Sequence, residues 1–270
     1  MAIVNRTPDS FYDRGATFAL DAAVARVDKA VSERADIVDI GGVKAGHGPP
    51  VSEDEEIART SDLVAAVRDR HPGVVISVDT YRHRVADAVC TAGADLINET
   101  WAGADPDLAS VAAQHGVGLV CSHTGGLPPR TDPHRVRYDD VMAAVIAGTT
   151  ALADKALAAG VRGDGLLVDP THDFGKNTYH SLELTRRLDE LVAFGWPVLV
   201  ALSRKDFVGE TLDLPVDDRL AGTLAATVVS AWHGARVFRA HDVTATRHAL
   251  DMVAAIRGAR TPAVARRGLA

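Results

Sequence analysis

Eight short apolar segments of the chain each end in, or are followed by, a polar side chain that could do chemistry. Alanine-rich stretches with helical spacing separate the segments, and eight strand–helix units predict an α/β protein, a closed parallel eight-stranded (β/α)8 or TIM barrel. In such a barrel the carboxyl ends of all strands meet at one mouth. We therefore expect a single pocket lined by these polar residues: Asn5, Asp79, Asn98, His123, Asp169, Lys205, Arg239 and His241.

Three of these residues, Asp79, Asn98 and Asp169, form an acceptor-rich set at strand ends. Two carboxylates and one amide suit a flat heterocycle that presents amine and ring N–H donors. Lys205 can add a cationic donor to a ring oxygen or nitrogen. The competing interpretations are that Asp79 caps the following helix, that Lys205 is a solvated loop charge and that His123 is structural. Asp169 is harder to explain as a cap, because we expect no helix after it until about residue 181.

A second set of residues could hold an anion. Arg239 and His241 alternate at the end of the last segment, so their side chains lie on the same side of the chain, and Asn5 ends the adjacent first segment. A guanidinium presents a planar fork to phosphate oxygens. Mg²⁺ favours oxygen ligands and substrate phosphates, so it could bridge Asn5 and a pyrophosphate. Because no carboxylate pair is dedicated to the metal, we expect the ion to arrive with the substrate.

The bulk composition limits the classes of function that the chain can have. The chain has 270 residues, 47% of them apolar, which fits one domain over residues 1–262 and a flexible basic tail over 263–270. A net charge of −7 and 5% aromatic residues argue against a nucleic-acid partner. The sequence has no run of 18 apolar residues to predict a membrane span, and its start does not resemble a signal peptide. Two cysteines make no disulfide framework, so we expect a cytoplasmic protein.

Several catalytic motifs are absent from the sequence. It has no G-x-G-x-x-G after a strand, no G-x-x-x-x-G-K-[ST] loop, no Cys/His set with zinc spacing and no G-x-S-x-G elbow. Lys44 ends no strand, which makes a Schiff base a weak hypothesis. These absences favour group transfer by positioning and charge stabilisation over covalent catalysis.

The elements that must position these side chains follow from the periodicity. The apolar segments are nearly continuous, which is typical of parallel strands covered on both faces. Ser52 with Glu55 three residues on predicts an N-cap and a capping box. The long loops follow the strands, at 9–20, 42–51, 124–137 and 170–179, where barrel loops usually carry function. Helices are predicted at 21–34, 52–70, 82–92, 105–114, 138–159, 181–194, 216–233 and 245–257.

The motifs at the strand ends resemble those of the dihydropteroate synthase family. Residues 5–11 (N-R-T-P-D-S-F) are similar to the family's N-x-T-P-D-S-F opening, and residues 169–176 to its D-P-G-x-G-F-G-K. Further matches occur in order at residues 77–80 (S-V-D-T), 93–98 (G-A-D-L-I-N), 203–209 (S-R-K-D-F-V-G) and 239–243 (R-A-H-D-V). The resemblance covers almost the whole chain. Each motif is weak alone, but together they are specific.

The resemblance implies a reaction and roles for the residues. The family expels pyrophosphate from 6-hydroxymethyl-7,8-dihydropterin diphosphate and joins the pterin methylene to the amine of p-aminobenzoate. The loop around residues 9–11 and the loop after residue 42 would close over the p-aminobenzoate site, and a homodimer through the last helices is implied. By resemblance, the ring is bound by Asp79, Asn98, Asp169, Lys205 and Gly175, the pyrophosphate by Asn5 (with Mg²⁺), Arg239 and His241, and catalysis involves Lys205, Arg239, His241 and Asp9.

The chain also departs from the family pattern. The family's second loop reads G-G-E-S-T-R-P-G, whereas residues 41–50 read G-G-V-K-A-G-H-G-P-P, so the acid, both hydroxyls and the arginine are missing. Lys44 and His47 are the candidates to compensate, although neither offers a bidentate fork. Smaller departures are Arg6 for a small apolar residue, Glu99 for aspartate, Ser122-His123-Thr124 for M-H-M, and Thr171-His172-Asp173 within the glycines of the sixth motif.

Three hypotheses follow from the sequence. The first is a dihydropteroate synthase, or a close transferase that uses the same pterin diphosphate with another aryl amine as acceptor. The second is a divergent paralogue that binds a pterin or a sulfonamide with weak or no synthase activity. The third is a folate-binding methyltransferase domain on the same barrel, which predicts binding of methyl-tetrahydrofolate and a corrinoid partner.

Overall fold

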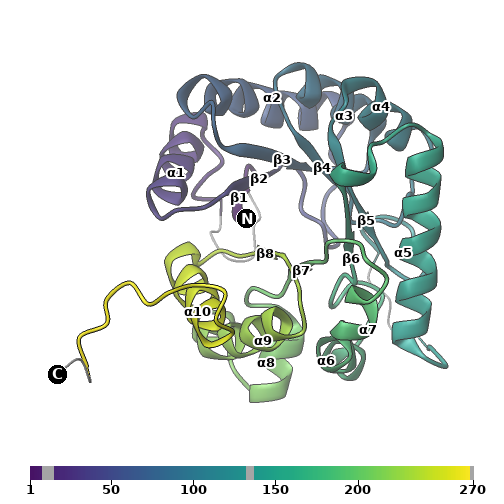
Figure 1. The fold of residues 1–270 in the computed structure, drawn as a ribbon. Helices are drawn as coiled ribbons and strands as arrows, with labels where there is room; N and C mark the ends of the chain where they lie inside the picture. Colours follow the sequence, from purple (N-terminus) through teal and green to yellow (C-terminus); the bar gives the residue numbers. More distant parts are fainter. Residues whose placement is uncertain (8–14, 132–136, 268–270) are drawn as a thin grey trace.

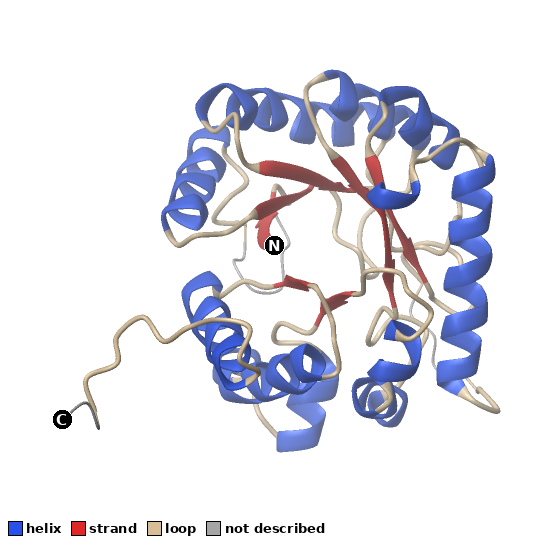
Figure 2. Ribbon diagram, in the orientation of Figure 1, coloured by secondary structure: helices blue, strands red, loops and turns tan. Residues whose placement is uncertain are grey.

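Eight strands surround a common axis and helices cover them on the outside (Figures 1 and 2). The structure, a computed structural model, describes residues 1–7, 15–131 and 137–267. The predicted catalytic residue Asp9 and the rest of the loop segment 9–11 lie outside the described residues.

All described strands are parallel and pair in sequence order. Six of them form one sheet and the last two form another. Single bridges join the sheets, one between Val168 and Val198 and one between Ala2 and Ala240, so the ring closes at both junctions. This confirms the predicted barrel. The strands are β1 Ala2–Asn5, β2 Ile37–Gly41, β3 Val75–Asp79, β4 Leu96–Asn98, β5 Gly118–Ser122, β6 Leu166–Asp169, β7 Leu199–Ala201 and β8 Val237–Arg239.

The outer layer differs from the prediction in two places. The helix predicted at 181–194 is two helices that part at Arg187, and the first of them already begins at Thr178. A further helix, α8, precedes the predicted 216–233 helix, which itself begins only at Leu220. Because α8 has seven residues, it is too short to show a clear helical period. The helices are α1 Leu20–Ser32, α2 Glu53–Arg70, α3 His83–Thr91, α4 Leu108–His115, α5 Val141–Ala158, α6 Thr178–Arg186, α7 Leu188–Val192, α8 Asp206–Leu212, α9 Leu220–Trp232 and α10 Val243–Ile256.

Two local features of the helices bear on the sequence predictions. Ser52 accepts a hydrogen bond from the backbone N–H of Glu55 at 3.2 Å, which confirms the predicted N-cap of α2. The Glu55 carboxylate pairs instead with Arg59 one turn later. Among the described helices, α5 alone is long and apolar enough to cross a membrane, but it packs against β5 and β6 as a core helix does.

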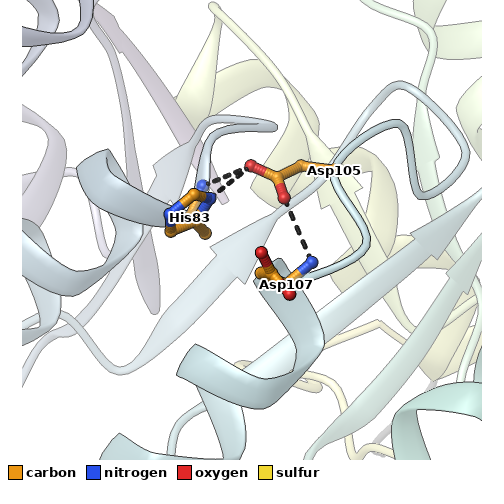
Figure 3. A group of neighbouring side chains, drawn as sticks. All are labelled: His83, Asp105 and Asp107. Atoms are coloured by element: carbon orange, nitrogen blue, oxygen red, sulfur yellow. Dashed lines mark hydrogen bonds and ion pairs between the residues drawn. The ribbon is translucent and has the colours of Figure 1, made fainter.

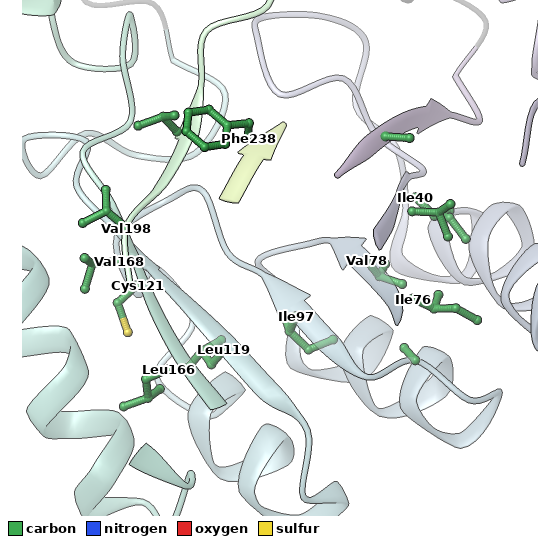
Figure 4. Packing of buried hydrophobic residues seen from close by; sticks show 14 of the residues in the cluster. Ile40, Ile76, Val78, Ile97, Leu119, Cys121, Leu166, Val168, Val198 and Phe238 are labelled. Carbon is green, nitrogen blue, oxygen red and sulfur yellow. The ribbon is translucent and has the colours of Figure 1, made fainter. Parts of the chain in front are cut away.

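The strand side chains alternate between two environments, which explains how continuous apolar runs can also carry polar site residues. Outward-facing residues such as Ile40, Ile76 and Ile97 pack against the helices in the main core (Figure 4). Leu96, Val120 and Leu199 form a separate small cluster on the inward-facing positions. Further toward the carboxyl ends, the inward positions become polar, and there the barrel interior opens into the mouth.

Candidate functional site

A cavity of about 510 Å³ lies at the carboxyl ends of the strands, within the size range of small-molecule sites. Five of the predicted residues line it: Asn5, Asp79, Lys205, Arg239 and His241. A larger cavity of about 870 Å³ lies at the opposite end, beside Met1 and Phe238, but none of the predicted site residues lines it. The convergence of chemistry-bearing side chains therefore singles out the smaller cavity.

The floor of the cavity is an ion-pair network centred on Arg239. Its Nε donates to Asp39 Oδ2 at 2.6 Å, and its Nη2 lies 3.3 Å from Asp79 Oδ2. Asp39 is fully buried and also accepts from Ser77 Oγ at 2.6 Å and from Asn98 Nδ2 at 3.3 Å. Asp39 is not among the residues predicted from the strand ends. The signal that could have found it is a charged residue in the middle of an apolar strand, at an inward position two residues before the strand end.

Asp79 is the carboxyl group of this network that reaches the cavity. Burial raises its pKa to about 7, opposed by Arg239 and reinforced by the negative charges of Asp39 and Glu56. It therefore changes protonation near neutral pH and can accept from, or donate to, a heterocycle. Gly41, its partner in β2, leaves room here, because a Cβ at that position would lie 3.3 Å from Asn5 Oδ1.

Two predicted acceptors lie below the cavity wall instead of on it. Asn98 is 4% exposed and donates to Asp39. Asp169 is 6% exposed, and its Oδ1 accepts from Thr171 N at 2.7 Å. Burial raises the pKa of Asp169, and the charge of Lys205 is the strongest influence in the other direction. Both residues lie in the layer of side chains behind the polar floor of the cavity.

Lys205 approaches the cavity from the loop after β7. Its Nζ donates to the backbone oxygen of His172 and lies 4.8 Å from the centre of the Phe174 ring. Burial lowers its pKa, while the carboxylates of Asp173 and Asp169 oppose that shift. The ammonium group is thus held between the sixth and seventh loops.

His241 is a neutral member of the site. Its Nδ1 lies 2.9 Å from Ser203 Oγ, and burial, together with the charges of Arg239, Arg204 and Arg26, lowers its pKa to about 3. At pH 7 it offers a hydrogen bond and no charge. With Arg239 bound to two carboxylates, the predicted anion site therefore carries less positive charge than its residue types indicate.

Two other predicted positions take structural roles. Gly175 does not line the cavity. A Cβ at this position would lie 2.1 Å from Thr124 O, so the loops after β5 and β6 can lie this close together only because residue 175 is glycine. His123 was expected at a wet strand end, but it is 8% exposed, and its backbone oxygen accepts from Lys176 Nζ at 2.6 Å. Burial lowers the pKa of the His123 imidazole to about 4.

The divergent second loop forms one rim of the cavity. Lys44 and His47 line it, and Arg130 reaches across from the loop after β5 to Pro49 O at 2.9 Å. Arg6 does not enter the cavity. Its guanidinium donates to Phe18 O at 3.1 Å and to Arg59 O at 2.8 Å, so it braces the first loop against α2.

A separate cluster lies outside the cavity, where α3 begins (Figure 3). His83 Nδ1 is 2.8 Å from Asp105 Oδ2, and the two groups lie with Asp107 close enough for one cation. Each oxygen of Asp105 already accepts a backbone N–H, one from His83 and one from Asp107. These bonds explain the cluster as a link between two helix starts.

Comparison with known proteins places the site in a class. A family model described as pterin binding enzyme matches residues 1–241. Together with the barrel and its polar mouth, this match defines the class of pterin-binding barrel enzymes. Within that class, the chain belongs to the dihydropteroate synthase family, of which it is a divergent member.

The similar proteins include some named inactive dihydropteroate synthase 2 and others named dihydropteroate synthase. The chain is 58% identical over 274 residues to inactive dihydropteroate synthase 2 of Mycobacterium leprae, covering 100% of this chain and 94% of that protein. It is 37% identical over 253 residues to the dihydropteroate synthase of Haemophilus influenzae, covering 93% and 91%. The Yersinia pestis dihydropteroate synthase in complex with a sulfonamide drug superimposes with a TM-score of 0.91 at 36% identity, covering 96% and 94%.

Proposed function

We propose that the chain is a pterin-binding paralogue that holds a dihydropterin ring in the mouth cavity and performs the synthase reaction weakly or not at all. The observation that carries the proposal is the convergence of Asp79, Arg239 and Lys205 on one cavity, backed by the buried acceptor Asp39. A pterin edge presents amine and ring N–H donors beside ring acceptors. A carboxyl group that can be either protonated or ionised, with cations beside it, matches that pattern.

The weak or absent turnover is proposed from the second loop. A p-aminobenzoate carboxylate, or that of another aryl amine, needs a donor at the rim, and the loop offers Lys44 and His47 there. Neither provides the bidentate fork of an arginine. The relative that is 58% identical is named inactive dihydropteroate synthase 2, which agrees with weak or absent turnover.

Mg²⁺ enters this proposal only as part of a diphosphate substrate. Mg²⁺ prefers six oxygen ligands and usually takes one or two carboxylates plus phosphates. Asn5 offers one amide oxygen at the cavity wall, while Asp79 is committed to Arg239. This donor set fits an ion that brings most of its ligands with it and does not fit a resident metal.

The test combines binding with turnover. We expect calorimetry to show binding of 6-hydroxymethyl-7,8-dihydropterin, and the Asp79→Asn variant to weaken it. The matched control, Asp87→Asn, removes an exposed carboxylate from α3 that pairs with His115 and should leave affinity unchanged. With p-aminobenzoate, Mg²⁺ and the pterin diphosphate, we expect little or no pyrophosphate release. Turnover at the rate of a synthase assayed in parallel would restore the synthase interpretation, and no pterin binding would overturn the proposal.

We further propose a homodimer through α9 and α10. In α9 the polar residues Thr223, Thr227 and Ser230 face the barrel, whereas Val228 and Trp232 are exposed. The neighbouring α10 exposes two more large apolar side chains, Met252 and Ile256. Large exposed apolar side chains on two neighbouring helices are typical of an interface, and a two-fold axis would bring the two helix pairs together.

A further inference from the structure

The loop after β6 follows a backbone path that suits glycine but carries larger side chains. Thr171 has a φ of 55° and Asp173 a φ of 70°, both in the left-handed region that non-glycine residues rarely adopt. These are the positions at which the D-P-G-x-G-F-G-K pattern has glycines. The chain therefore keeps the loop conformation and adds a hydroxyl and a carboxylate.

The two added side chains point to different partners. Thr171 Oγ1 accepts from His123 N at 3.2 Å and stays buried against β5. Asp173 lines the cavity, and its carboxylate accepts from Phe207 N at 3.1 Å and from Ser181 Oγ at 3.0 Å. Asp173 is thus fixed between α6 and α8, at the start of the helix that follows Lys205.

Asp173 adds negative charge beside Lys205. Burial raises the pKa of the Asp173 carboxyl group, and the charge of Lys205 is the first influence in the other direction; Asp173 in turn opposes the lowered pKa of Lys205, ahead of Asp169. The two arginines that line the cavity are already paired, Arg239 with Asp39 and Asp79 and Arg204 with Asp242. Lys44 at the rim adds one positive charge, whereas a diphosphate group carries two or three negative charges.

We propose that Asp173 sets the selectivity of the cavity, because it compensates Lys205 and so favours a pterin without a diphosphate over the diphosphate ester. The inference rests on the proposed binding of a pterin ring. It names the ligand class as an uncharged 6-substituted pterin and makes Asp173 a specificity-determining residue. Weaker binding of the diphosphate also gives a physical reason for weaker synthase turnover.

The experiment measures two dissociation constants for each variant by calorimetry, one for 6-hydroxymethyl-7,8-dihydropterin and one for its diphosphate with Mg²⁺. Asp173→Asn keeps an acceptor for Phe207 N, tolerates a positive φ and removes the charge. We expect it to tighten the diphosphate about tenfold, which is about 1.4 kcal/mol, while the alcohol changes by less than about twofold. Asp173→Gly, which suits the backbone, should act in the same direction.

Glu210→Gln is the matched control. It removes one carboxylate from α8 that bonds Thr178 of α6, so it changes net charge and the same helix junction away from the cavity. We expect it to leave both constants unchanged. An equal change of both constants in the Asp173 variants, or an unchanged ratio, would overturn the selectivity role while pterin binding stands. Failure of the wild-type protein to bind either ligand would overturn the proposed function as well.

Discussion

Replacing Arg239 by methionine is the sharpest test of the network under the cavity. The guanidinium is 17% exposed and faces one carboxylate that is fully buried, Asp39, and one that is 19% exposed, Asp79. Methionine fills similar space without charge. Asp79, whose pKa already lies at about 7, can take up a proton at little cost. Asp39 is then the carboxylate left without a cation.

The magnitude follows from the carboxylate that the variant leaves behind. Breaking a buried pair by removing one partner costs about 3–5 kcal/mol, because the remaining charge is buried without compensation. Such a loss is a large part of the ~5–15 kcal/mol that stabilises a typical domain.

A second variant separates the effect of the stranded charge from that of the lost side chain. The double variant Asp39→Asn/Arg239→Met removes the stranded charge and should be more stable than the single variant at pH 7.

The assay is urea unfolding at pH 7, followed by tryptophan fluorescence, to which Trp101, buried beside Phe174, contributes. The control Arg162→Met removes an exposed arginine paired only with Asp164 among the described residues, and its midpoint should match the wild-type value. A loss below about 1 kcal/mol for Arg239→Met, or a double variant no more stable than the single variant, would refute the reasoning.

Two further predictions concern protonation and assembly. The pKa of Asp79 is raised from its unfolded value near 4 to about 7 in the fold, so its contribution to stability is complete below pH 4 and is lost as the pH rises through 7. Across that window, the free energy of unfolding in urea should decline less steeply with pH for Asp79→Asn than for the wild-type protein. An equally steep decline would contradict the shift. Light scattering should give twice the chain mass for the wild-type protein and the single chain mass for Trp232→Arg. The control Val264→Arg changes an exposed residue of the tail and should keep the mass of the dimer. A monomeric wild-type protein would exclude the dimer.

The barrel was predictable because its evidence is local. Each strand is an apolar run and each helix has its own period, so the number and order of units follow from short stretches of sequence. The split at Arg187 and the short helix α8 were not predictable in this way. Those elements depend on contacts with the loops after β6 and β7, which no window of the sequence contains.

The candidate site was predictable by residue type and only partly by role. The strand-end rule found Asp79, Lys205 and Arg239, because the barrel brings strand ends together whatever the loops do. It could not show that Arg239 is bound to Asp39, 200 positions away in the chain, or that burial keeps the His241 imidazole neutral. Charge state depends on burial and partners, and neither is written in the spacing of a motif.

The network on the cavity floor is a poor guide to whether the chain is an active synthase. Because losing Arg239 alone strands a buried carboxylate, Asp39 and Arg239 depend on each other for stability whether or not the chain catalyses a reaction. Lys44 is partly exposed on a loop, and Asp173 sits at a φ that glycine would take with less strain. These two positions therefore carry more information about the reaction than the cavity floor does. The second loop has lost the arginine and both hydroxyls of the family pattern, which are hydrogen-bond donors, and the loop after β6 has gained a carboxylate that acts on Lys205. The first change is expected to weaken binding of the p-aminobenzoate carboxylate, and the second to weaken binding of the diphosphate.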